Sequence, residues 1–143
     1  MKTFYTIVFL LISGSVLAQQ ADPDSISTPQ PETFQMQWGD STITMQKYFV
    51  VFLKTGPERG QSEEQAADIQ QKHLDYLSKV YKLGKTSITG PFGDDGEIRG
   101  IVIYNTATLE EAKQLAEQDP AVKAGRLVVE VHPWWAAKGS TLK

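Results

Sequence analysis

The sequence predicts an α+β domain, in which two helices cover one face of a four-stranded antiparallel sheet. Three observations lead to this prediction. Residues 63–82 and 109–118 carry apolar side chains at helical spacing. Four shorter segments are rich in β-branched and aromatic residues, and turn residues separate them. The resulting order of strand, helix, strand, strand, helix and strand is the ferredoxin-like arrangement.

The first 18 residues have the layout of a secretory signal. Lys2 precedes an apolar run over residues 7–12, and Val16 and Ala18 are small residues placed for cleavage before Gln19. The run is shorter than the ~20 apolar residues of a membrane-spanning helix, which favours cleavage over an uncleaved membrane anchor. We therefore expect a periplasmic or secreted protein that has no membrane segment after cleavage.

The segment between this signal and the domain has two parts. Residues 19–33 are polar and proline-rich, which predicts a flexible linker. Residues 34–46 alternate apolar and polar side chains around a turn at Gly39, which predicts a short strand or hairpin. We expect this extension to cover a sheet edge, and the alternative is that it covers the mouth of a site. The folded domain is then expected at residues 47–135, before a C-terminal tail at 136–143.

The first half of the domain begins with a strand at residues 47–54, where almost every side chain is apolar. Ser62 is a candidate N-cap for the first helix, because Gln65 stands three residues later. Residues 85–92 form the second predicted strand. Both faces of the first strand are apolar, yet the helices cover only one. We therefore expect a homodimer, with a second copy of the chain on the open sheet face.

The second half begins with a Gly-Asp-Asp-Gly turn and a strand at residues 97–104. The second helix is expected to end at about Gln118, because Pro120 disfavours helical geometry at the residue before it. Residues 126–132 form the last predicted strand.

A histidine lies on the apolar side of the first helix. At 100° per residue from Ala66, His73 falls at about −20°. It lies among the apolar residues of that face, which are Ala66, Ile69, Leu77, Val80 and Tyr81. Asp119 points in the direction of the second helix's apolar stripe, and the two helices are neighbours in this topology. A carboxylate bonded to one imidazole nitrogen leaves the other as a general acid or base. The alternative is a structural histidine and an unrelated aspartate at a helix end.

A second cluster, His132, Trp134 and Trp135, offers another candidate histidine. Its other interpretation is that the tryptophan pair holds the C-terminal tail or the dimer interface. Two histidines, no cysteine and no clustered carboxylates argue against a metal site, and we expect no cofactor. A net charge of −3 without a basic patch argues against nucleic-acid binding.

The order and spacing of several short motifs resemble those of the YCII-related family, over about Met45 to Trp135. The motifs are His73-Leu74-Asp75-Tyr76-Leu77, Gly84, Ile88-Thr89-Gly90-Pro91, Asp119-Pro120 and Gly125. The resemblance implies a ferredoxin-like dimeric α/β barrel with His73 and Asp119 as the active pair in a cleft. We also expect four residues to bind the substrate, which are Gly90, Pro91, Pro120 and Trp134.

The chain departs from its relatives at two positions. Gln70 stands where some members have an arginine, and Ala121 stands where many have an aromatic residue. These departures imply a wider and less cationic site. One relative is a dehydrochlorinase acting on a chlorinated hydroxyquinol.

We expect a cofactor-free enzyme that uses the His–Asp pair for isomerisation, lyase chemistry or dehalogenation of a small cyclic or aromatic compound. The alternative is a non-catalytic module that binds a small ligand or a partner.

Overall fold

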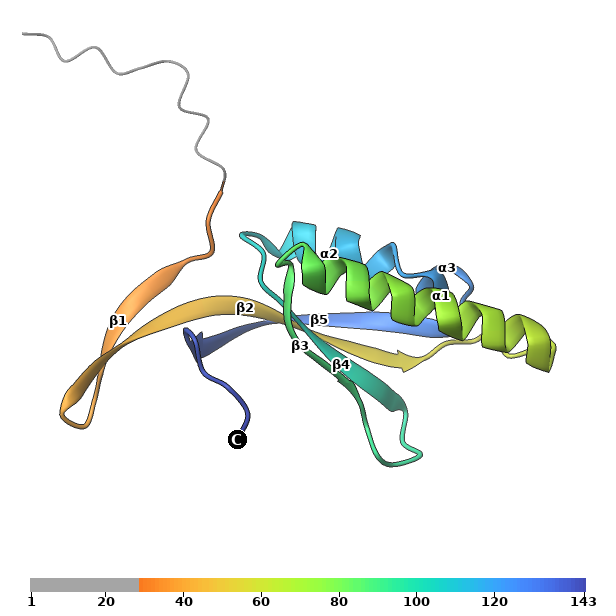
Figure 1. Ribbon diagram of the computed structural model, residues 1–143, viewed down its shortest axis with the longest axis horizontal. Coiled ribbons are helices and arrows are strands. Elements are labelled where there is room, and N and C mark those ends of the chain that lie inside the picture. The colour runs from red at the N-terminus through yellow and green to blue at the C-terminus, as the bar shows by residue number, and fades with distance from the viewer. Residues whose placement is uncertain (1–28) are drawn as a thin grey trace, which may run out of the picture.

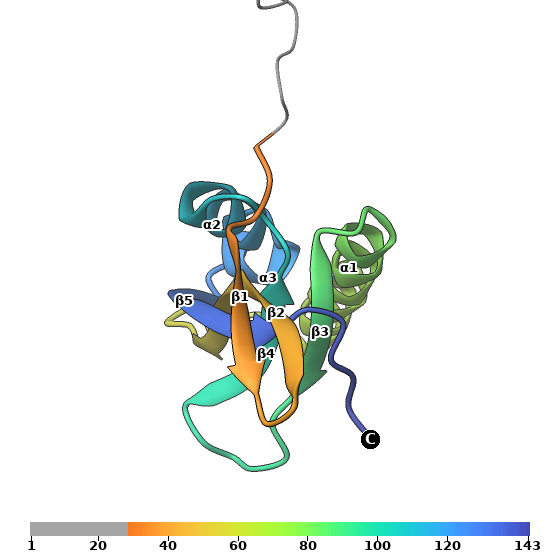
Figure 2. The same cartoon turned by 90° about the vertical axis from the view of Figure 1, so that its left-hand side faces the viewer.

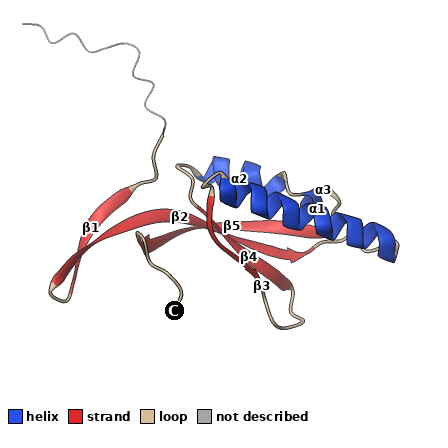
Figure 3. Ribbon diagram, in the orientation of Figure 1, coloured by secondary structure: helices blue, strands red, loops and turns tan. Residues whose placement is uncertain are grey.

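The computed structural model describes residues 29–143 as two layers, with the helices on one face of an antiparallel sheet (Figures 1 and 3). The predicted signal peptide, residues 1–18, lies outside the described residues, and so do residues 19–28 of the predicted linker. None of the helices within residues 29–143 has the length and apolar character needed to cross a membrane.

Five strands form the sheet. They are β1 (Thr33–Trp38), β2 (Ser41–Thr55), β3 (Thr86–Pro91), β4 (Ile98–Tyr104) and β5 (Leu127–Ala137). Strand β2 pairs with β4 along one edge and with β5 along the other, and β3 pairs with β4. All pairings are antiparallel, which confirms the predicted α+β, ferredoxin-like class.

The predicted number of four strands is wrong by one, because the N-terminal extension joins the sheet. Strand β1 pairs with the first part of β2, from Thr33 opposite Gln46 to Trp38 opposite Ser41. The alternation after Gly39 and the apolar run after Gln46 form one continuous strand of 15 residues. In Figure 1 this hairpin projects away from the helices. Because β1 pairs with residues 41–46 of β2, it covers the edge of β2 along that part of the strand.

Strand β5 is longer than predicted, so the expected tail at residues 136–143 begins inside it. It continues through Pro133 and both tryptophans to Ala137. Proline is tolerated there because β5 is an edge strand, where one side has no hydrogen-bonding neighbour.

Three helices cover the sheet: α1 (Glu63–Lys82), α2 (Leu109–Glu117) and α3 (Pro120–Lys123). Viewed from the end of the sheet, α1 stands beside α2 and α3 (Figure 2). Helix α1 begins with the predicted capping box, in which the Ser62 hydroxyl accepts a hydrogen bond from the backbone N–H of Gln65 at 3.2 Å. The short helix α3 was not predicted. Proline is well suited to the first helical position, so Pro120 ends one helix and starts the next.

The core lies between the helices and one face of the sheet. Its buried side chains come from β2, β4 and α2: Phe49, Val51, Leu53, Val102, Tyr104, Ala112 and Ala116. Alternate residues of a strand point to opposite faces, so Val50 and Phe52 point away from the helices. No described helix covers that second face (Figure 3). Tyr81, predicted on the inward face of α1, is 63% exposed because it lies at the margin of the apolar stripe.

Candidate active site

The two residues of the predicted pair meet beneath the helices. His73 projects from the middle of α1, and Asp119 lies between α2 and α3. His73 Nδ1 and Asp119 Oδ2 are 2.7 Å apart, and both side chains are buried. The two residues are 46 positions apart in sequence, so this contact depends on the packing of α1 against the α2–α3 corner.

The position of Asp119 is fixed by its role as the N-cap of α3. Its Oδ1 accepts a hydrogen bond from the backbone N–H of Ala121 at 2.8 Å, which satisfies a donor that the start of a helix leaves open. Pro120 holds the first helical position beside it. One carboxylate oxygen therefore orients the side chain, and the other remains for His73.

This arrangement determines which nitrogen of His73 carries the proton. A carboxylate oxygen only accepts hydrogen bonds, so His73 donates from Nδ1. In the neutral ring Nε2 then has a free lone pair. No buried side-chain nitrogen or oxygen within residues 29–143 lacks a hydrogen-bond partner, and Nε2 makes no hydrogen bond. It follows that Nε2 is not completely buried.

Two tyrosines lie close to the pair but do not titrate near neutral pH. Burial raises the pKa of Tyr76, and the charge of Asp119 raises it further. The Tyr76 hydroxyl donates to the Leu115 carbonyl at 2.7 Å. Burial also raises the pKa of Tyr104, and Tyr76 and Asp119 add to the effect. Both phenols therefore stay protonated and cannot replace His73 as a base.

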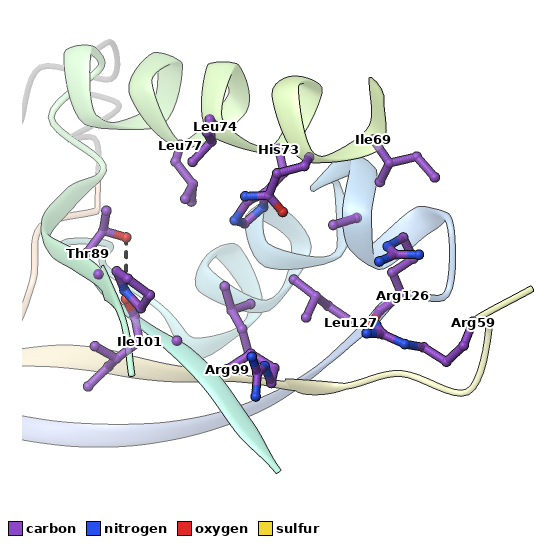
Figure 4. A pocket seen from close by; sticks show the side chains of 16 residues that line it. Arg59, Ile69, His73, Leu74, Leu77, Thr89, Arg99, Ile101, Arg126 and Leu127 are labelled. Atoms are coloured by element: carbon purple, nitrogen blue, oxygen red, sulfur yellow. Dashed lines mark hydrogen bonds between the residues drawn. The ribbon is translucent and has the colours of Figure 1, made fainter. Parts of the chain in front are cut away.

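A cavity of about 500 Å³ lies between α1 and the sheet, and His73 is part of its wall. Figure 4 shows the imidazole projecting from α1 towards this space. Ligand sites typically enclose ~300–1,000 Å³. His73 is the one lining residue with an imidazole, the side chain most often used as a general acid or base. The others are Leu53, Arg59, Ile69, Gln70, Leu74, Leu77, Thr89, Gly90, Pro91, Arg99, Gly100, Ile101, Ala121, Arg126 and Leu127.

The predicted substrate-binding residues divide into two groups. Gly90 and Pro91, at the end of β3, line the cavity. Pro120 does not line it, and its neighbour Ala121 does. Trp134 also does not line it, because β5 turns Trp134 to the face without helices, where its ring lies 6.3 Å from that of Tyr48. The substrate-binding role expected for Trp134 does not match this position.

The two positions at which the chain departs from its relatives lie at the cavity, and three arginines lie there as well. Gln70 and Ala121 do line the cavity, but so do Arg59, Arg99 and Arg126. Arg59 and Arg126 come from a loop and a turn, where no periodic pattern shows which way a side chain points, and Arg99 comes from near the start of β4. The structure therefore supplies positive charge from positions that the sequence did not indicate.

The second candidate histidine lies on the opposite face of the sheet. His132 Nε2 is 2.8 Å from Glu130 Oε1, and both side chains are exposed. Within residues 29–143, no group of three or more His, Cys, Asp or Glu side chains is arranged to hold a metal ion.

Comparison with known proteins gives a family and a set of similar solved structures. Residues 48–135 match the model of the YCII-related domain. One similar solved structure is 5-chloro-2-hydroxyhydroquinone dehydrochlorinase (TftG) from Burkholderia phenoliruptrix AC1100, in complex with 2,5-dihydroxybenzoquinone. It is 24% identical, the match covers 61% of this chain and 92% of that chain, and the TM-score is 0.48. Similarity at this level says nothing about the substrate of the present chain. No curated protein matches the chain significantly.

Proposed function

The chain belongs to the YCII-related domain family, and we propose that it is a cofactor-free enzyme that moves a proton on a small cyclic or aromatic substrate. The observation that carries the proposal is the 2.7 Å hydrogen bond from His73 Nδ1 to Asp119 Oδ2, with Nε2 open to a cavity of ligand size. Asp119 fixes the tautomer and stabilises the charged ring, so Nε2 acts as the general base.

The first chemical step is removal of a proton from substrate carbon or hydroxyl by Nε2. The electron pair of the broken bond moves into the ring system of the substrate, and the imidazolium that forms is stabilised by the Asp119 carboxylate. Return of the proton to a second carbon completes an isomerisation. Expulsion of an anionic leaving group, with the proton retained on His73 until solvent takes it, completes an elimination.

A single base limits the stereochemistry. Every other side chain in the cavity wall is apolar, an arginine, an amide or a hydroxyl, and arginine stays protonated at neutral pH and cannot act as a base. His73 therefore both removes and returns the proton. We expect the proton to leave and return on the same face of the substrate.

Exchange with heavy water tests the proposal whatever the overall reaction is. A panel of small phenols and lactones in D2O is followed by NMR, together with the His73→Ala variant and the matched control His132→Ala. Removing a general base lowers the rate ~10²–10⁴-fold, and His132→Ala leaves it unchanged. Equal exchange in wild type and His73→Ala would contradict the proposal. Tight binding of a compound without any exchange would instead indicate the non-catalytic binding module.

We also propose that this site works outside the cytoplasm. The support is the signal-like sequence of residues 1–18. Mass spectrometry of the protein from its native host should then find a mature N-terminus at Gln19, and an intact Met1 terminus would argue against export.

A further inference from the structure

All three arginines of the chain line the cavity beside His73, although they belong to three separate segments. Arg59 lies in the loop between β2 and α1, Arg99 in β4, and Arg126 in the turn before β5. Arg59 Nη1 donates to the Arg126 carbonyl at 3.2 Å, and the two side chains lie together at one end of the cavity (Figure 4). The chain thus places three permanent positive charges around one small space.

None of these charges is neutralised within residues 29–143. Arg99 Nη1 donates to the Gly96 carbonyl at 3.2 Å, and Arg126 Nη1 donates to the Gln61 side-chain oxygen at 2.8 Å. Neither acceptor carries charge, and no aspartate or glutamate lines the cavity. A guanidinium has five N–H donors, so most donors of the three arginines remain available.

The lysines of the same domain show that the arginines do not lack carboxylate partners because acidic groups are scarce. Five lysines form ion pairs with carboxylates in the described part of the chain: Lys47, Lys54, Lys72, Lys85 and Lys113. The whole chain has 17 acidic and 14 basic residues, and a net charge of −3. Acidic groups are therefore in excess, but they are absent from the wall that holds the arginines.

Apart from His73, Gln70 and Thr89, the rest of the cavity wall is apolar. Leucine and isoleucine side chains come from α1, β2, β4 and β5: Leu53, Ile69, Leu74, Leu77, Ile101 and Leu127. Apolar walls strengthen the attraction between charges by lowering the local dielectric constant. A ligand with a ring and one anionic group would contact both parts of this wall.

We propose that the cavity binds a small cyclic carboxylate, with the carboxylate held by the arginines and the ring lying against α1 beneath His73. The planar guanidinium matches a carboxylate through paired hydrogen bonds. The inference rests on the proposed function for the role of His73, and it names the class of substrate for that site. The arginines also favour the negative charge that develops when Nε2 removes a proton.

Calorimetric titration with two matched compounds tests this substrate class. 4-Hydroxybenzoate carries the carboxylate, and 4-hydroxybenzyl alcohol has the same ring without the charge. We expect the carboxylate to bind at least about tenfold more tightly, a difference of about 1.4 kcal/mol. The wild-type comparison involves no substitution, so it does not depend on the folding of any variant.

Charge-neutralising variants then assign the preference to the arginines. Arg59→Gln, Arg99→Gln and Arg126→Gln should each weaken binding of 4-hydroxybenzoate about threefold or more, since each removes a charge-assisted hydrogen bond. Lys123→Gln is the matched control, because Lys123 is exposed on α3 and does not line the cavity. Its affinity should equal that of wild type.

Several outcomes would overturn the inference. These are equal affinity for the two compounds, no binding of the carboxylate at about 10 mM, or a loss in Lys123→Gln as large as in the arginine variants. Tighter binding of phenyl phosphate would replace the carboxylate with a phosphate ester. His73→Ala should keep the preference for the carboxylate. Wild-type protein that shows this preference but catalyses no proton exchange would refute the proposed chemistry and leave the substrate class in place.

Discussion

The molecule contains two histidine–carboxylate pairs of almost equal length, one on each face of the sheet. His73 and Asp119 are 2.7 Å apart on the side of the helices, and His132 and Glu130 are 2.8 Å apart on the open side. Their surroundings differ. The exposed fractions of the side chains are 9% and 3% in the first pair but 53% and 47% in the second.

The difference in surroundings decides what each pair can do. Asp119 uses its second oxygen to cap α3, so its geometry is fixed on both sides. Glu130 also binds Lys54 at 3.2 Å, and together His132 and Lys54 lower the pKa of Glu130. Water screens such exposed pairs, and they contribute little to stability. A short distance alone therefore does not identify a site. Burial and access to a cavity distinguish the His73 pair.

The two pairs also hold their rings in opposite tautomers. Asp119 accepts from Nδ1 of His73, whereas Glu130 accepts from Nε2 of His132. The free nitrogen of His73 is therefore Nε2, and that of His132 is Nδ1.

The largest expected effect comes from amide substitutions that keep the shape of each carboxylate. In Asp119→Asn the amide oxygen can remain on the Ala121 N–H, and the amide nitrogen then donates to His73 Nδ1. This moves the ring proton to Nε2, so the base is lost, and we expect proton exchange to fall ~10²–10⁴-fold. Glu130→Gln should leave exchange unchanged in the same assay. Equal losses in both variants would remove the distinction between the pairs.

The next largest effect concerns the oligomeric state. We propose that a second copy of the chain packs against the sheet face that no helix covers. The support for this proposal is the exposed apolar side chains of that face, among them Val128 and Trp134 of β5. Light scattering after size exclusion should then give about twice the mass of the monomer. Phe52→Lys places a charge on this face and should give the monomer mass. Tyr81→Lys places the same charge on the helix side, and should leave the dimer intact. A wild-type monomer would refute the proposal.

A smaller effect is expected on stability. Asp119→Ala leaves two buried donors, His73 Nδ1 and the Ala121 N–H, without their acceptor. Each unsatisfied buried group costs about 1–3 kcal/mol, so the free energy of unfolding in urea should fall by about that amount or more. Glu130→Ala should give the urea midpoint of wild type. A wild-type midpoint for Asp119→Ala would show that the pair is not well ordered.

Most of the fold follows from local patterns in the sequence. Alternation and apolar runs located the strands, and the capping box located the start of α1. The elements that the sequence did not predict depend on their surroundings in the folded chain. Helix α3 has only four residues, too few for a periodic pattern, and β5 continues through Pro133 because an edge strand tolerates proline.

The site was less completely predictable. His73 could be found because it interrupts a helical apolar face, and Asp119 because it follows the stripe of the next helix. The three arginines carry no such signal, since they lie 40 and 27 positions apart in irregular or differently oriented segments (59 to 99, then 99 to 126). Trp134 was expected to bind the substrate. Its position two residues after His132, on the face opposite Val129 and Val131, was the signal against that role.

The most direct test reads both histidines in one experiment, a long-range proton–nitrogen NMR spectrum of the 15N-labelled protein. We expect the neutral His73 ring to carry its proton on Nδ1 and the His132 ring on Nε2. Addition of 4-hydroxybenzoate should shift the Nε2 resonance of His73 and leave both nitrogens of His132 unchanged. A His73 ring protonated on Nε2, or one that does not respond to the bound carboxylate, would contradict the assignment of the His73–Asp119 pair as the active site.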